Sequence, residues 1–163
     1  MTTTEAIQKI CTLACEQTGY HEGENNYNKF AENPFMKKAL GWDAQNQPWC
    51  AIFVVHLFIE CFGLRTGKRM MHGCSALCRA QAAKYRRHGA YYTTPRIGDQ
   101  IFFRSEGGIN HTGVVVGVSD ETVTTVEGNS GDSVAERTYR LDDASIAGYG
   151  RPNWALVADD GEA

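Results

Sequence analysis

In Gln47-Pro48-Trp49-Cys50-Ala51-Ile52-Phe53-Val54-Val55 a polar, turn-forming run ends and an apolar run begins, and the rest of the fold is expected to pack around this point. Residues 49–62 are apolar nearly all round, which predicts a central helix that is buried on most sides. Pro48 presets the backbone for the start of this helix. Cys50 stands at that start, where free backbone N–H groups and the positive end of the helix dipole favour thiolate over thiol. The stretch therefore predicts a nucleophilic cysteine on a buried helix.

Helical periodicity appears on both sides of the central helix. Residues 4–18 place apolar side chains at helical spacing and predict an amphipathic first helix. Residues 28–40 predict a second, shorter helix. After a basic loop over residues 64–74, the small-residue-rich run 75–87 predicts a helix that packs closely on the central one.

The pattern changes after residue 89 to short β-prone runs separated by glycines and short turns. Helices first and strands second, with hairpin-length connections, predict an α+β fold with an antiparallel sheet. We expect one domain over residues 1–163, with a helical part over about 1–90 and a sheet part over about 91–155. The predicted strands cover residues 100–103, 112–118, 122–126, 134–140 and 146–149.

Composition excludes several classes of protein. The chain is 42% hydrophobic with a net charge of −3 and a pI of about 5.9, which argues against a nucleic-acid-binding protein. No apolar segment approaches the length needed to span a bilayer, so we expect no membrane insertion. The first residues lack the basic and apolar regions of a secretory signal, and we expect synthesis in the cytoplasm.

The six cysteines do not form an obvious disulfide or metal framework. Cys11 and Cys15 lie four residues apart in a helical pattern, as do Cys74 and Cys78, and such cysteines are more often reduced, buried small hydrophobes. His72, Cys74 and Cys78 suggest zinc, but there is no CxxC pair and no second cluster to complete a tetrahedral site. We therefore predict no metal site.

A thiolate nucleophile needs a base, usually histidine, and the histidine needs a group that holds its tautomer. Among five histidines, His111 opens the strongest β-run. Glu127 and Asn129 lie on the next predicted strand and share a face because they are two residues apart. With the turn centred near residue 120, position 111 lies opposite roughly position 129. Cys50, His111, Glu127 and Asn129 are therefore the predicted catalytic residues; the alternative for the last two is a polar turn.

Four motifs occur in order: Pro48-Trp49-Cys50-Ala51-Ile52-Phe53-Val54, Pro95-Arg96-Ile97-Gly98-Asp99-Gln100-Ile101-Phe102-Phe103, His111-Thr112-Gly113-Val114-Val115 and Val126-Glu127-Gly128-Asn129-Ser130-Gly131. They resemble the CHAP family of cysteine, histidine-dependent amidohydrolases/peptidases, as in phage endolysins. The resemblance implies a papain-like fold and cleavage of peptidoglycan amide bonds. It assigns Cys50 as nucleophile, His111 as base, Glu127 as the group orienting the histidine, and Asn129 as a further polar member.

Two features of the family find no counterpart here. Some members have an aspartate-rich calcium loop before the cysteine, whereas this chain offers only Asn25, Asn26, Asn28 and Asp43 in that region. Calcium prefers several carboxylate ligands, so we expect no cofactor and keep calcium as the less favoured alternative. No residues remain for a separate cell-wall-binding domain, and a separate targeting subunit is one alternative.

The expected function is that of a peptidoglycan hydrolase in a phage or prophage endolysin, made in the bacterial cytoplasm and acting on the wall after release or delivery. The sequence does not choose between an N-acetylmuramoyl-L-alanine amidase and a stem-peptide or cross-bridge endopeptidase. The alternatives are a secreted antibacterial amidase effector with the same chemistry and a non-catalytic phage structural or wall-binding module. Trp49, Tyr27 and Tyr149 are candidates for substrate binding, and core packing is the alternative for each.

Overall fold

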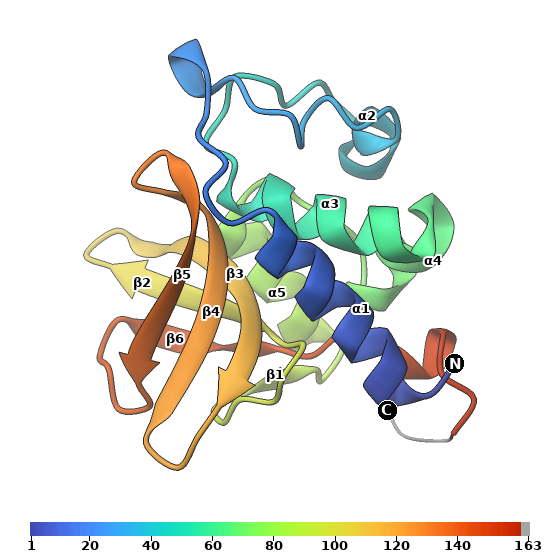
Figure 1. Ribbon diagram of the computed structural model, residues 1–163, viewed down its shortest axis with the longest axis vertical. Coiled ribbons are helices and arrows are strands. Elements are labelled where there is room, and N and C mark those ends of the chain that lie inside the picture. The colour runs from blue at the N-terminus through green and yellow to red at the C-terminus, as the bar shows by residue number, and fades with distance from the viewer. Residues whose placement is uncertain (161–163) are drawn as a thin grey trace.

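The computed structural model describes residues 1–160, in which helices precede a β-sheet (Figure 1). The predicted α+β class, with Cys50 at the start of a central helix, is confirmed. The helices are α1 (Thr3–Glu16), α2 (Met36–Leu40), α3 (Cys50–Phe62), α4 (Leu64–Met70) and α5 (Cys78–Arg87), with short 3-10 turns at Glu24–Asn26 and Trp154–Leu156. The strands are β1 (Tyr91–Tyr92), β2 (Gln100–Ser105), β3 (Gly108–Val118), β4 (Thr122–Ser130), β5 (Ser133–Arg140) and β6 (Ile146–Gly150).

The six strands form one antiparallel sheet in the order β1-β6-β2-β3-β4-β5. Strands β2 to β5 follow one another as hairpins, and β6 returns to pair with the outer side of β2. Figure 1 shows the helices gathered on one side of this twisted sheet. Among the described residues, no helix is both long and apolar enough to cross a membrane.

The sheet buries side chains on both faces because successive residues of a strand point to opposite sides. Phe102 and Val114 belong to the main core, which they share with the helices. Their neighbours Phe103 and Val115 belong to a second cluster on the other face, together with Ile101, Val123 and Tyr149. The sheet therefore carries a buried apolar cluster on each face.

Helix α3 is the centre of the main core, as its apolar sequence predicts. Nine of its 13 residues are buried, and its first turn packs directly on β4. A Cβ at Gly128 of β4 would lie only 2.6 Å from Cβ of Phe53 and 3.0 Å from the Trp49 ring. Glycine at this position therefore lets the strand approach the start of α3 closely.

Two predictions of local structure are wrong. The helix predicted over residues 28–40 is present only as α2, because Asn28 and Asn33 use their side-chain oxygens to bind the N–H groups of Ala31 and Phe35 and so favour turns. The basic loop predicted over residues 64–74 contains helix α4. Its Gly67 lies against α3, where a Cβ would be 2.6 Å from the Phe58 carbonyl oxygen, so tertiary packing stabilises a helix that the sequence pattern does not reveal.

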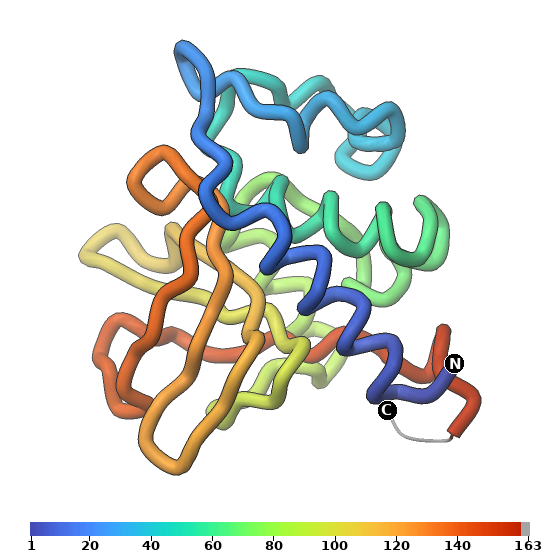
Figure 2. Tube along the Cα trace, in the orientation of Figure 1, coloured from blue at the N-terminus to red at the C-terminus, as the bar shows by residue number. Residues whose placement is uncertain are grey.

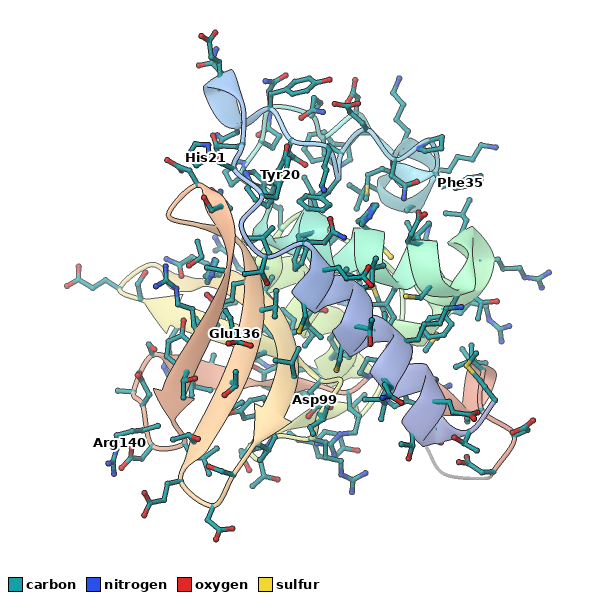
Figure 3. All side chains as sticks on the ribbon, viewed as in Figure 1. Tyr20, His21, Phe35, Asp99, Glu136 and Arg140 are labelled. Atoms are coloured by element: carbon teal, nitrogen blue, oxygen red, sulfur yellow. The ribbon has the colours of Figure 1, made fainter. Side chains whose placement is uncertain are left out.

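The segment between α1 and α3 passes over the helices before it returns to the start of α3 (Figure 2). Its first residues are attached to the β4–β5 hairpin, where the N–H of Val134 donates to the Tyr20 carbonyl at 2.8 Å. The N–H of Glu22 donates to the Asp132 carbonyl at 2.9 Å. Figure 3 shows Tyr20 and His21 beside the tip of this hairpin. The segment therefore links the sheet to the residues that precede Cys50.

Candidate active site

Cys50 is the first residue of α3 and is 6% exposed. Trp49 caps the helix without a side-chain hydrogen bond, so the first N–H groups have no partner from a capping side chain. The N–H of Ala51 binds the Cys50 sulfur. A second thiol lies close by: Sγ of Cys78, the first residue of α5, is 3.4 Å from Sγ of Cys50. The nucleophile therefore sits among backbone and side-chain donors.

His111 joins this cysteine to a buried carboxylate. Nε2 of His111, on β3, lies 2.8 Å from Oε1 of Glu127 on β4. The ring also interacts with the Cys50 side chain, and each group shifts the pKa of the other. Because Nε2 faces Glu127, Nδ1 is the nitrogen left to serve the sulfur. The structure thus brings three of the four predicted catalytic residues together, in the order thiol, imidazole and carboxylate that a thiol hydrolase requires.

The register of β3 and β4 explains how Glu127 reaches the histidine. Val114 pairs with Val126, and the same register continued along the strands sets Gly113 opposite Glu127. A Cβ at Gly113 would lie 2.6 Å from Cγ of Glu127. The carboxylate arm therefore crosses β3 over a residue that has no side chain, and it meets His111 two positions away on the same face.

Two hydroxyl groups hold the other oxygen of Glu127. Oγ1 of Thr125 donates to Oε2 at 2.6 Å, and the Tyr139 hydroxyl of β5 donates to it at 2.7 Å. Glu127 is 1% exposed, so each of these bonds replaces a lost bond to water. Neither Thr125 nor Tyr139 is among the site residues predicted from the sequence. Thr125 could have been found from its place two residues before Glu127, whereas Tyr139 depends on the pairing of β4 with β5.

The surroundings of Cys50 favour its thiolate. The hydrogen bond from Cys78 is the largest effect and lowers the pKa of Cys50; burial opposes it, and the hydrogen bond and charge of His111 and the N–H of Ala51 lower the pKa further. The net result is a Cys50 pKa well below its usual value. A buried thiolate is the reactive form of the nucleophile.

The charges of His111 and Glu127 complement this thiolate. Burial is the largest effect on His111 and lowers its pKa, but the hydrogen bonds and negative charges of Cys50 and Glu127 outweigh it and raise the pKa to about 9. Burial likewise raises the pKa of Glu127, but hydrogen bonds from His111, Thr125 and Tyr139 outweigh it and leave that pKa below its usual value. These shifts together favour the thiolate of Cys50, the imidazolium of His111 and the carboxylate of Glu127.

Asn129 lies at the end of β4, where the pairing of β4 with β5 is irregular between Glu127 and Ser130. Its φ of 51° is left-handed, so the alternation that would set its side chain beside that of Glu127 is broken. Within residues 1–160, no hydrogen bond joins the Asn129 side chain to the other three predicted catalytic residues. The structure thus does not bring Asn129 into the hydrogen-bonded chain.

The three candidates for substrate binding occupy different places. Trp49 is fully buried, stacks on Phe30 and donates from Nε1 to Glu22 Oε1 at 3.0 Å. Tyr149 is 1% exposed and lies in the second core cluster. Tyr27 is 44% exposed, on the segment between α1 and α2. Neither Trp49 nor Tyr149 offers surface to a substrate, and Tyr27 alone of the three is accessible.

A groove of about 460 Å³ opens at the nucleophile. Its walls are mainly apolar, and among the described residues that line it Arg79 is the only charged one. Arg79 is exposed and lies one residue beyond Cys78 on α5. The lining residues are Pro48, Cys50, Ala76, Leu77, Cys78, Arg79, Ala80, Ala83, Ile109 and Asn110.

In the region where some CHAP proteins bind calcium, oxygen atoms of this chain accept hydrogen bonds from nearby amide groups. The carbonyl oxygens of Asn25 and Asn26 accept from the side-chain amides of Asn46 and Asn28, at 3.0 Å each. Oδ1 of Asp43 accepts the N–H of Gln45 at 3.1 Å. In residues 1–160, no group of three or more His, Cys, Asp or Glu side chains is placed to hold a metal ion. These residues do not fit a calcium loop.

Comparison with known proteins agrees with this geometry. The family model of the CHAP domain matches residues 42–129, more than half of the chain, and the match includes Cys50, His111, Glu127 and Asn129. A comparison with curated proteins finds no match. The chain therefore belongs to the CHAP family of cysteine- and histidine-dependent amidohydrolases and peptidases that act on peptidoglycan.

Proposed function

We propose that this CHAP domain is an active thiol hydrolase that cleaves an amide bond of peptidoglycan, as an N-acetylmuramoyl-L-alanine amidase or as a stem-peptide or cross-bridge endopeptidase. One observation carries the proposal: the His111 ring lies between the Cys50 thiol, with which it interacts, and the buried Glu127 carboxylate, to which it is hydrogen-bonded, and Cys50 lines a groove. A non-catalytic wall-binding module would not need a carboxylate held by three donors behind the histidine. The presence of all three groups in this arrangement therefore favours an active hydrolase over a non-catalytic wall-binding module.

The reaction is acyl transfer. The Cys50 thiolate attacks the amide carbonyl carbon, and the negative charge that develops on the carbonyl oxygen is stabilised by the N–H of Cys50, which has no acceptor inside its own helix. The His111 imidazolium then gives its Nδ1 proton to the leaving amine. A water molecule, activated by the neutral imidazole, hydrolyses the thioester and regenerates the thiolate.

The groove supports a peptide substrate. Its apolar walls suit the alanine methyl groups of a stem peptide, and Arg79 is placed to pair with a stem-peptide carboxylate. Leu77, 66% exposed at the rim, adds apolar contact area. We assign substrate binding to these residues of α5 and its preceding loop.

We further propose a phage or prophage endolysin, made in the bacterial cytoplasm and released to the wall. All six cysteines are free, including the close pair Cys50 and Cys78, which suits a reducing compartment.

The test is digestion of purified peptidoglycan, with mass analysis of the products. Intact stem peptides separated from glycan strands identify an amidase, and cuts within or between stems identify an endopeptidase. Cys50→Ala is the control and is expected to release nothing. Release by this variant at the wild-type rate would exclude the thiol mechanism, because the nucleophile is then another group.

A further inference from the structure

Two cysteines meet at the starts of two helices. Cys50 begins α3 and Cys78 begins α5, their sulfurs are 3.4 Å apart, and they are 6% and 7% exposed. Neither helix has a side-chain cap, so each directs unpaired N–H groups and its positive dipole end toward this pair. Such surroundings stabilise one negative charge shared by two sulfurs.

The hydrogen bond between the sulfurs has a direction. The Cys50 bond is the largest effect on Cys78 and, together with burial, raises the pKa of Cys78 far above its usual value. The contact alone leaves either sulfur as the donor, but Cys50 also interacts with His111 and with the N–H of Ala51, which favour its charged form, and Cys78 has neither partner. We therefore assign the proton to Cys78 and the role of acceptor to the Cys50 thiolate.

We propose that Cys78 is a further functional residue of this site: its S–H stabilises the Cys50 thiolate, and on oxidation its sulfur closes a disulfide with Cys50. This deepens the proposed function, because it concerns the same nucleophile. Cys78 contacts the reacting sulfur itself and also lines the groove that would hold the substrate.

The oxidative step requires a hydroperoxide. The Cys50 thiolate attacks one oxygen of hydrogen peroxide, the O–O bond breaks and hydroxide leaves, so that the sulfur is oxidised to a sulfenic acid and the peroxide is reduced. The Cys78 sulfur then attacks the sulfenic sulfur, the S–O bond breaks, and water forms with the Cys78 proton. The product is an inactive disulfide that a thiol reductant reopens.

The first test measures the rate at which Cys50 reacts with iodoacetamide as a function of pH, without any substrate. Cys78→Ala is expected to raise the apparent pKa of Cys50 by about one unit and to slow alkylation about tenfold below that pKa, because a hydrogen bond to the charged form is lost. Cys78→Ser retains an O–H donor and is expected to restore most of the rate. Cys74→Ala, which removes a buried cysteine four residues away, serves as the control.

The second test exposes the proteins to hydrogen peroxide. Wild type is expected to lose alkylation of Cys50, to yield a linked Cys50–Cys78 peptide on mass analysis, and to recover with dithiothreitol; Cys78→Ala is expected to yield no such peptide. The proposal is overturned if Cys78→Ala and Cys74→Ala share the wild-type pH profile, or if peroxide links Cys50 to no partner. Neither readout uses hydrolysis, so failure here is distinct from failure of the proposed function.

A separate observation concerns charge. Residues 61–98 contain half of the 16 Lys and Arg residues and no Asp or Glu, although the whole chain carries a net charge of −3. The low pI and negative net charge of the whole chain therefore conceal a basic segment. The basic residues are Arg65, Lys68, Arg69, Arg79, Lys84, Arg86, Arg87 and Arg96.

Part of this segment forms a basic pocket of about 490 Å³. Arg65, Lys68 and Arg69 of α4 line it, together with His72 and His88, whose rings stack with centroids 4.5 Å apart. No acidic side chain is among the described lining residues, and none of the salt bridges in residues 1–160 involves these cations. No salt bridge among residues 1–160 offsets their mutual repulsion, and a bound anion would relieve it.

We propose that this pocket binds a phosphate-bearing anionic polymer of the bacterial cell wall and holds the domain on its substrate layer. The basic lining calls for an anionic partner, and the peptidoglycan substrate of the family brings the domain beside the polymers of the cell wall rather than beside nucleic acid. The proposal rests on the proposed function only for the location of the partner, and binding can be measured without catalysis.

The test measures sedimentation with purified walls of the full chain carrying Cys50→Ala, which prevents hydrolysis. Arg65→Glu with Arg69→Glu is expected to weaken binding about tenfold or more, and binding is expected to fall as salt rises. Lys37→Glu with Lys38→Glu makes the same charge change on exposed residues of α2 and is expected to bind as the parent does. Equal binding by both double variants, undiminished binding to walls stripped of phosphate polymer, or binding only to RNA or anionic vesicles would overturn the proposal.

Discussion

Replacing Gly113 by alanine should disable the site without touching any of its polar groups. The new Cβ would lie 2.6 Å from Cγ of Glu127 and 2.9 Å from the Val126 carbonyl oxygen. Carbon atoms in contact prefer about 3.5–4.0 Å, so the Glu127 arm must move by about 1 Å. That displacement breaks the 2.8 Å contact with Nε2 of His111. Misplacement of a catalytic group by about 1 Å can cost about 100-fold in rate.

The expected result is a kcat for peptidoglycan hydrolysis lowered about 100-fold, with overpacking reducing the free energy of unfolding by about 1–3 kcal/mol. Release of soluble fragments measures the rate, and urea unfolding shows that the variant remains folded under the assay conditions. Loss of the contact with the Glu127 carboxylate should also let the pKa of His111 fall, which moves the alkaline limit of activity to lower pH.

Gly117→Ala is the matched control on the same strand. Its Cβ would lie 3.4 Å from Cβ of Thr124, an ordinary contact, and neither glycine has a positive φ that would penalise alanine. This variant should hydrolyse peptidoglycan within about twofold of wild type. A folded Gly113→Ala protein with wild-type kcat and pH profile, or an equal loss in Gly117→Ala, would refute the assignment of Glu127 as the group that positions His111.

The rate of hydrolysis should give a bell-shaped pH profile. Its acid limb follows deprotonation of Cys50, whose pKa is well below its usual value, and its alkaline limb near pH 9 follows loss of the His111 proton. A rate that still rises above pH 9 would contradict this prediction. Tyr139→Phe should lower the free energy of unfolding by about 1.5–3 kcal/mol, measured by urea unfolding, because Glu127 loses a charge-assisted hydrogen bond. No change in stability or kcat would show that Tyr139 does not stabilise the Glu127 carboxylate. Arg79→Ala should raise KM about tenfold or more at little-changed kcat, with Arg79→Lys intermediate, and unaltered KM would remove Arg79 from the substrate site.

The centre of the site could be predicted because the β3–β4 connection is short. When two strands are joined by a tight turn, spacing gives their register to within one residue. Next to the turn Val118 pairs with Val123, and an irregularity between Val115 and Gly117 then shifts the register by one residue. The resulting pairing of Val114 with Val126 is the one that sets position 111 opposite position 129. The start of α3 could be predicted as well, because Pro48 and the apolar run after it mark a helix start in the sequence.

Other members of the site depend on contacts that spacing does not fix. Tyr139 reaches Glu127 through the pairing of β4 with β5, and Cys78 reaches Cys50 only because α5 packs against the start of α3. The position of the Asn129 side chain has a local cause, because its left-handed backbone at an irregular pairing breaks the two-residue alternation. Each of these features arises from tertiary structure rather than from a motif.

The hydrogen bond from Trp49 to Glu22 bears on how the domain should be cut for expression. A fragment limited to residues 42–129, the span of the family match, would leave the indole N–H of a fully buried ring without its acceptor. The same fragment would lack β5 and with it Tyr139, one of the three donors to Glu127. A recombinant version that is to keep its activity should therefore start ahead of α1 and extend beyond β6.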